Sequence, residues 1–383
     1  LPKLGYAVVG PTLAFGDVAS IRAAIDTGGT TGLATSERFR EARADLSGDR
    51  LAFMWADTAA AMSADLVPAD LDPDGTLRAL AELVREITPA WMAATVRAVD
   101  GTLVMDTRSP RPTAFAAATP RASAIASLVP PDTLFLTAGH DVGSALATLR
   151  GVLAAKPALA DAVREVEGVL AFVGGFDAVT GWIGDVGVAV APDPGGDGVV
   201  GGLVVTPTDA AKARQLFTTL GAFLALGGGD MGFEVRTETH GGAEITILDL
   251  GPLDDLTDEA TGGMLPVPGG NAQLAFTVTG GGGGVGLGSS FVRAVLDARD
   301  GPSLADDGRF AALLARAGGN HGQLGWVDLA AIRGLVESAI PASDRAEYDA
   351  DVRPYLAPFD VIISVVVPGE TIDRGRAIIT FTP

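Results

Sequence analysis

The residues with the clearest potential for chemistry are three aspartates at alternate positions, Asp70, Asp72 and Asp74, followed by Gly75. This spacing opens calcium loops of the EF-hand type, in which carboxylates wrap a hard cation. The acid expected at the twelfth position is missing, and Glu82 stands one residue beyond it. The alternative is an acidic turn that is stabilised by the dipole of a following helix. Both interpretations stay open, and we assign no metal ligands.

A glycine-rich stretch from Gly280 to Gly288 contains a GxGxG pattern before a predicted helix, as phosphate-binding loops do. A dinucleotide loop follows a single strand directly, whereas a second strand over Val285–Leu287 intervenes here. We therefore interpret the stretch as the loose tip of a β-hairpin and predict no nucleotide cofactor.

The remaining candidates for catalysis are weak. His140, His240 and His321 are too scattered to predict a metal site, and the acidic stretch 254–259 is typical of a solvated loop. His240-Gly-Gly resembles part of an esterase oxyanion loop, but the chain has no G-x-S-x-G nucleophile motif. With no cysteine, thiol catalysis, disulfides and thiolate metal sites are excluded. We predict no catalytic, cofactor-binding or metal-binding residues and no enzymatic activity.

Composition narrows the possible partners. A formal net charge of −20 makes nucleic acid a poor ligand, because a phosphate backbone requires a basic surface. It also argues against adsorption to an anionic membrane. With 48% hydrophobic and 19% charged residues, the chain is a well-packed globular protein. No run is long and apolar enough to predict a transmembrane helix.

The elements that must position any site are short strands, mostly in hairpins, alternating with helices. Clear hairpin signals are Asp100-Gly101 and Gly241-Gly242, and the segment 75–87 has the apolar spacing of a helix. The pattern predicts an α+β fold with antiparallel or mixed sheets, without a parallel βαβ rhythm. A Pro/Ala-rich stretch over 108–126 is a predicted linker between a first unit, 1–107, and a second unit, 127–383.

An internal repeat relates the two units. Leu33–Asp57 matches Leu304–Asp328 at a fixed offset of 271 residues, which aligns Trp55 with Trp326 and Asp57 with Asp328. Since the chain has only four tryptophans, this match points to duplication. In a strand, positions two apart share a face, so the tryptophan and the aspartate project together. We predict a packed ring and a helix N-cap at this motif.

The repeat also predicts chain outside this sequence. Residues 1–107 match only about 265–383, the second part of the larger unit. We therefore expect a counterpart of 128–262, roughly 130 or more residues, upstream of Leu1, together with an export signal or anchor. A reading frame that opens at Leu1 would contradict this expectation.

The second unit resembles a bacterial family known as domain of unknown function 3352 (DUF3352). The resemblance rests on diffuse structural motifs: Leu128-Val-Pro-Pro-Asp132-Thr133, Trp182-Ile-Gly184-Asp185, Thr208-Asp209-Ala210-Ala211, Ser303-Leu304-Ala305-Asp306 with Phe310, and Trp326-Val-Asp328. It covers 128–383 and, in part, 1–107, where Gly32 stands in place of Ser303. The resemblance implies an exported or membrane-anchored envelope protein and brings no catalytic residues.

Two functions remain in view, and a calcium-stabilised surface protein is a third possibility. The first is an extracytoplasmic structural or binding module of the cell envelope, periplasmic or at the cell surface, with protein partners. The second is an enzyme or small-ligand-binding protein with a site in the groove between the units. A pocket lined by polar residues that the sister unit lacks favours the second, whereas a broad apolar patch favours the first.

Overall fold

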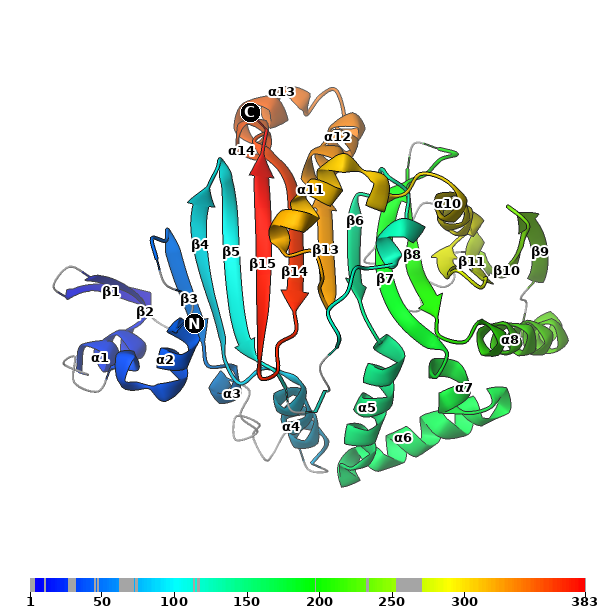
Figure 1. Ribbon diagram of the computed structural model, residues 1–383, viewed down its shortest axis with the longest axis horizontal. Helices are drawn as coiled ribbons and strands as arrows, with labels where there is room; N and C mark the ends of the chain where they lie inside the picture. The colour runs from blue at the N-terminus through cyan, green and yellow to red at the C-terminus, as the bar shows by residue number, and fades with distance from the viewer. Residues whose placement is uncertain are drawn as a thin grey trace.

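The structure is a computed structural model of the 383-residue chain. It describes residues 4–9, 12–26, 32–44, 46, 48–61, 72, 75–112, 114–115, 118–196, 198–231, 234–252 and 271–382. Within these ranges the chain is an α+β protein, as predicted. A 13-stranded antiparallel sheet runs through it, and a separate two-stranded sheet lies at the N-terminal end (Figure 1).

The N-terminal part contributes the small sheet and one end of the large one. Its elements are β1 (Leu4–Val9), β2 (Thr12–Asp17), α1 (Val18–Asp26), the 3₁₀ helix η1 (Leu33–Thr35), α2 (Glu37–Arg43), β3 (Ala52–Ala56), α3 (Thr58–Ala61), α4 (Thr76–Ile87), β4 (Met92–Val99) and β5 (Thr102–Pro110). The Asp100-Gly101 turn joins β4 to β5, as predicted, with both residues at positive φ. Strand β5 extends through Pro110, into the stretch that we expected to be linker.

The middle of the chain follows the linker and forms the other end of the sheet. Its elements are η4 (Ile125–Leu128), β6 (Phe135–Gly139), α5 (Val142–Ala154), α6 (Pro157–Leu170), η5 (Ala171–Val173), α7 (Phe176–Thr180), β7 (Ile183–Pro192), β8 (Val199–Pro207), α8 (Ala210–Met231), β9 (Glu234–His240) and β10 (Ala243–Pro252). The predicted turn at Gly241-Gly242 joins β9 to β10.

The C-terminal part adds two strands between β8 and β10 and then returns to the centre of the sheet. Its elements are β11 (Asn271–Val278), β12 (Gly283–Leu287), α10 (Ser289–Asp300), η6 (Leu304–Asp306), α11 (Gly308–Ala317), β13 (Gln323–Asp328), α12 (Leu329–Ala339), α13 (Arg345–Asp351), α14 (Arg353–Leu356), β14 (Phe359–Val367) and β15 (Ile372–Phe381). The strand order is β3-β4-β5-β15-β14-β13-β6-β7-β8-β12-β11-β10-β9. Both predicted units therefore share one sheet.

The two units meet where β5 pairs with β15 (Figure 1). Asp106 lies directly opposite Arg376 in this pairing. The hairpin partner of β5, which is β4, lies on its outer side, and that of β15, which is β14, lies on the opposite outer side. Next come the strands that carry the tryptophans, β3 beside β4 and β13 beside β14. This arrangement is approximately twofold about the β5–β15 contact, as a duplicated pair of units would produce.

The largest hydrophobic core lies in the second unit. Trp326, Phe310, Phe291, Leu136 and Ile363 are each at most 1% exposed and belong to it. A smaller core in the first unit is built around Trp91, Ala42 and Leu46, with Trp55 packed against it. Among the described residues, the second unit therefore buries the larger set of apolar side chains.

Candidate functional site

The structure supports the acidic-turn interpretation for Asp72. Its carboxylate is 5% exposed and accepts hydrogen bonds from the backbone N–H groups of Leu77, at 2.8 Å, and Arg78, at 3.1 Å. Both oxygens therefore bind the start of α4. Asp70 and Asp74 lie outside the described residues. In the part of the chain that is described, no group of three or more acidic or histidine side chains is placed to hold a metal.

The glycine-rich stretch is a hairpin tip, as predicted. Strands β11 and β12 pair in antiparallel register from Leu274–Leu287 to Val278–Gly283. Gly286 has a packing role, because a Cβ there would lie 2.9 Å from Phe291 of α10. The glycine therefore allows α10 to lie close against the sheet, which explains it without a nucleotide.

The Trp-x-Asp motif forms the same contacts in both units. Trp326 lies edge-on to Phe310, with ring centroids 5.3 Å apart, and its Nε1–H donates to the carbonyl of Thr133 at 2.9 Å. Asp328 accepts from the backbone N–H of Ala331 at 2.8 Å and pairs with Arg309. The packed ring and the N-cap are thus confirmed.

The first unit repeats this geometry with weaker burial. Trp55 lies edge-on to Phe39 at 5.6 Å but is only half-buried. Asp57 accepts from the N–H of Ala60 at 3.0 Å and pairs with Arg38 at 3.2 Å. The motif therefore stabilises each unit and performs no visible chemistry.

Two of the three histidines, which no motif connects, lie together in a buried polar network. The rings of His140 and His321 stack with centroids 5.4 Å apart, and His140 Nδ1 lies 2.8 Å from a carboxylate oxygen of Asp185. Arg121, from the predicted linker, pairs with Asp185 and with Asp141, at 3.1 Å for the latter. Its backbone also forms a β-bridge with His321. The network fastens the linker to the second unit.

The charges of this network perturb one another. The hydrogen bond from Arg121 holds the pKa of Asp141 below its usual range. Burial lowers the pKa of His321, so the neutral ring is favoured. Its Nδ1 lies 2.6 Å from the carbonyl of Gly319, which can only accept, so this nitrogen carries the proton. The third histidine, His240, lies apart from them, and its Nε2 is 2.6 Å from Asp297 near the surface.

A cavity of about 440 Å³ lies over the junction of the two units, on the sheet face that α2 and α11 flank. We call it the junction groove. Its lining residues come from both units: Leu46, Thr95, Arg97, Asp106, Thr107, Arg108, Ala317, Val365, Val367, Arg374, Gly375 and Arg376. Its size falls within the range of roughly 300–1,000 Å³ that is usual for small-ligand sites. It is the strongest candidate site in the described part of the chain.

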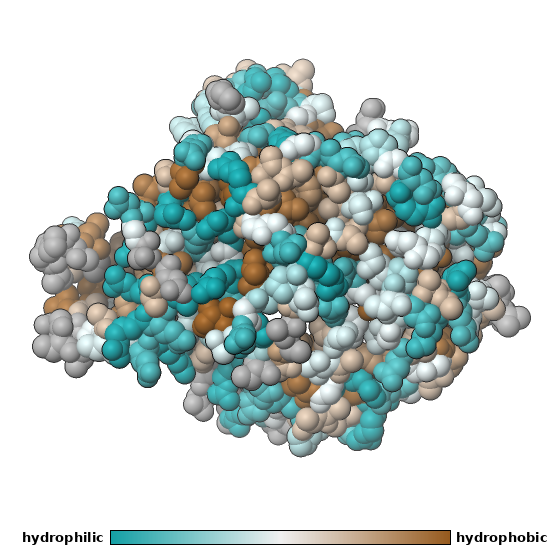
Figure 2. All heavy atoms as spheres, in the orientation of Figure 1, coloured by the Kyte–Doolittle hydropathy of each residue, from teal (hydrophilic) through white to brown (hydrophobic). Residues whose placement is uncertain are grey.

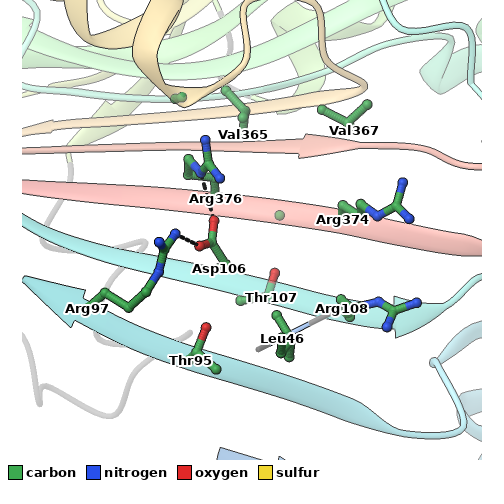
Figure 3. A pocket seen from close by; sticks show the side chains of 12 residues that line it. Leu46, Thr95, Arg97, Asp106, Thr107, Arg108, Val365, Val367, Arg374 and Arg376 are labelled. Atoms are coloured by element: carbon green, nitrogen blue, oxygen red, sulfur yellow. Dashed lines mark hydrogen bonds and ion pairs between the residues drawn. The ribbon is translucent and has the colours of Figure 1, made fainter. Parts of the chain in front are cut away.

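The junction groove is cationic in a strongly acidic chain. Arg97, Arg108, Arg374 and Arg376 line it, against one described carboxylate, that of Asp106. Figure 3 shows Asp106 between two of these arginines, and it pairs with Arg97 and with Nε of Arg376, the latter at 2.7 Å. Four guanidinium groups therefore gather where the two units meet.

Strand register shows that the two units supply different side chains to equivalent places. Trp55 lies opposite Ala93, and Trp326 lies opposite Ile363, so Ala93 and Ile363 are equivalent. Two residues further along β4 and β14, Thr95 is equivalent to Val365.

The same register extends to the strands at the junction. Arg97 is equivalent to Val367, Arg108 to Ile378, Arg374 to Val104, and Asp106 to Arg376. Three of the four arginines of the junction groove therefore have an apolar counterpart in the sister unit. The sister unit forms the same strand arrangement without these arginines, which is what we expected of a ligand site between the units.

Figure 2 has the orientation of Figure 1 and shows hydrophilic residues gathered over β4, β5 and β15.

The small sheet contrasts with this surface, because one of its faces is apolar. Leu4, Tyr6, Val8, Leu13 and Phe15 all project from one face of the β1–β2 hairpin and are 67–76% exposed. None of the helices in the described part of the chain combines the length and apolarity that a membrane crossing requires.

The fold and the junction groove define an α+β protein with a cationic groove between two similar halves. The model of a family described as protein of unknown function, DUF3352, matches residues 6–247, more than half of the chain. The chain belongs to that family. The match includes the motifs at 128–133, 182–185 and 208–211, whereas those from Ser303 onward lie beyond it. Comparisons with curated proteins and with solved structures find no match.

The sequence analysis considered a ligand site between the units but named none of its residues, because the arginines are separated by up to 279 positions, from Arg97 to Arg376. Alternation within β4, β5 and β15 places each arginine on a face, but only the β5–β15 register brings them together. A usable signal existed in the repeat: arginines at positions where the sister strand is apolar.

Proposed function

We propose that this chain is a non-catalytic, extracytoplasmic binding module of the cell envelope that holds a small ligand in the junction groove. The observation that carries the proposal is the contrast between the sister strands. Arg97, Arg108 and Arg374 occupy positions where the other unit has Val367, Ile378 and Val104. A structural module requires only the apolar version of these positions.

Binding without catalysis is supported by the kinds of side chain in the junction groove. Arginine stays protonated at all ordinary pH values and is therefore unsuited to proton transfer. The described lining residues include no histidine, lysine or serine, and the carboxylate of Asp106 is engaged by two guanidinium groups. The extracytoplasmic location is part of the proposal and rests on the family resemblance.

The test is to fill the groove without changing its charge. Val367 is half-buried at the edge of the groove, so Val367→Trp places an indole in the cavity. The matched control is Val336→Trp on α12, where the valine is 54% exposed. Native mass spectrometry of protein isolated under mild conditions is expected to show a bound small molecule in the wild type and in Val336→Trp. The molecule should be absent from Val367→Trp.

Two results would count against this proposal. Equal ligand retention by both tryptophan variants would place the ligand outside the junction groove. Conversion of the recovered ligand into a new product by the wild-type protein would show that the module is an enzyme.

A second function is favoured by the apolar face of the β1–β2 hairpin. Five large side chains exposed by 67–76% on one face form a surface of the kind that mediates protein contacts. We propose that this face contacts a second copy of the chain. Light scattering is expected to show self-association that Tyr6→Ser and Phe15→Ser abolish, and a wild-type chain that stays monomeric at all concentrations would contradict it.

A further inference from the structure

The strand β3, at one end of the large sheet, lacks a neighbour that its sister strand has (Figure 1). Among the described residues, β3 pairs only with β4. Its sister β13 pairs with β14 along one edge and with β6 along the other. The edge of β3 that corresponds to the β6 side of β13, which we call the outer edge, is therefore unpaired in the described part of the chain.

The two sister tryptophans show the same difference at a single atom. Nε1–H of Trp326 donates to the carbonyl of Thr133, just before β6, at 2.9 Å. Trp55 holds the equivalent position in β3, and its Nε1 is buried without a hydrogen-bond partner in the described part of the chain. A buried donor that lacks an acceptor is destabilising. The indole of the first unit therefore lacks the acceptor that the residues before β6 supply in the second.

The outer edge of β3 also presents backbone groups. In the second unit, the backbone N–H of Asp328 donates to the carbonyl of Leu134 at 2.8 Å, so the backbone of Asp328 faces the β6 side. In an antiparallel ladder, every second residue directs its N–H and C=O to the same edge. The equivalent residues of the first unit are Phe53, Trp55 and Asp57. Their backbone groups therefore face away from β4.

The two ends of the sheet differ in the side chains that they carry. Strand β9, at the far end, has Glu234, Arg236 and Glu238 at alternate positions. Charges on an edge strand discourage pairing with other chains. Strand β3 reads Ala-Phe-Met-Trp-Ala, without a charge or a proline, and its Met54 is 51% exposed. The end at β9 is thus protected against a further strand, and the end at β3 is suited to receive one.

A strand at the outer edge would complete the core of the first unit. In the second unit, Leu136 of β6 belongs to the same buried cluster as Trp326 and Phe310. The equivalent ring of the first unit, that of Trp55, is only half-buried. An apolar side chain in the place of Leu136 would cover this ring.

We propose that the outer edge of β3 pairs with a strand equivalent to β6, supplied by the counterpart of 128–262 that the repeat predicts upstream of Leu1. In the register of β13, Trp326 lies opposite Leu136, and its indole donates to the carbonyl of Thr133. The incoming strand therefore offers Trp55 the same two contacts. The strand β6 of a second copy is unsuited, because β13 and β7 occupy both its edges. This pairing is independent of the ligand that we propose for the junction groove.

The experiment supplies the whole chain with such a strand. Residues 128–140 are grafted before Leu1 through a Gly/Ser linker of about 20 residues, which has a typical end-to-end distance of about 25 Å. Hydrogen exchange is measured at single residues. The backbone amides of Phe53, Trp55 and Asp57 are expected to exchange fast in the ungrafted chain. In the grafted chain they should exchange at least about tenfold more slowly, because pairing protects them.

The matched control is a graft of the same length that carries Leu134→Pro and Leu136→Pro, since proline does not fit a paired strand. The control graft should leave the exchange of the three amides as in the ungrafted chain. Unchanged exchange with the intact graft would overturn the proposal, as would equal protection by both grafts. Slow exchange in the ungrafted chain would also overturn it, and a dependence of that protection on protein concentration would assign the outer edge to a second copy.

A substitution tests the role of the indole. Trp55→Phe retains an aromatic ring but removes the N–H, so the protection that the graft gives should fall about fivefold. The matched control is Trp182→Phe, which removes another buried indole N–H without a partner among the described residues, packed against Phe217 in the second unit. It should retain the full protection, and circular dichroism establishes that both variants are folded. Equal protection in Trp55→Phe and Trp182→Phe would refute the contact between the indole and the incoming strand.

Discussion

Replacing Trp326 with alanine removes the buried ring of the repeated Trp-x-Asp motif. The ring is 1% exposed, packs edge-on against Phe310 and donates a hydrogen bond to the carbonyl of Thr133. Truncating a buried tryptophan or phenylalanine costs about 3–5 kcal/mol. The carbonyl left without its donor adds about 1–3 kcal/mol if water does not reach it. We expect a loss of about 4–8 kcal/mol in the free energy of unfolding.

Trp55 is the internal control for this prediction. It occupies the same position in the first unit and packs against Phe39 in the same way, but it is only half-buried. Since the cost scales with the apolar area returned to water, Trp55→Ala should cost about 2 kcal/mol. Urea unfolding followed by far-UV circular dichroism measures both variants without depending on tryptophan fluorescence. A Trp326→Ala variant that loses no more stability than Trp55→Ala would refute the packing argument.

Three further predictions concern other positions. Gly286→Ala should destabilise the protein by about 1–3 kcal/mol in urea unfolding, because its Cβ would meet Phe291 at 2.9 Å, whereas Gly280→Ala at the open hairpin tip should change little. Burial lowers the pKa of His321 from 6.5. The stability that the neutral, buried imidazole contributes is therefore complete above pH 6.5 and is lost as the pH falls through the folded-state pKa. The melting temperature of His321→Asn should fall less between pH 7.5 and 5 than that of the wild type. Asp72→Ala should cost about 1 kcal/mol because it removes the acceptor at the start of α4, and a wild-type melting temperature lowered by a chelator would instead favour calcium.

The local features of the fold could be predicted because neighbouring residues determine them. The aspartate at the end of each Trp-x-Asp motif caps the next helix, three residues from its donor. The Asp100-Gly101 turn requires positive φ at both positions, which this dipeptide tolerates. The hairpin at Gly280–Gly288 follows from the strands on either side. Such contacts depend on short spacing and on residue type.

The residues that line the junction groove could not be predicted in the same way. It exists because β5 pairs with β15, a strand some 270 positions away, and no local pattern selects that partner over another edge. The contacts of the linker could not be predicted either. Arg121 forms two ion pairs and a β-bridge, although the stretch around it has no apolar periodicity. Long-range pairing and side-chain networks of this kind are fixed by the tertiary structure.

The most direct test of the proposed binding function is the occupancy of the junction groove. Native mass spectrometry of the wild type and of Val367→Trp, in which an indole fills the groove, measures this occupancy. A small molecule that is bound to the wild type and absent from Val367→Trp is the expected result. Equal retention of the molecule by the two proteins would contradict the account.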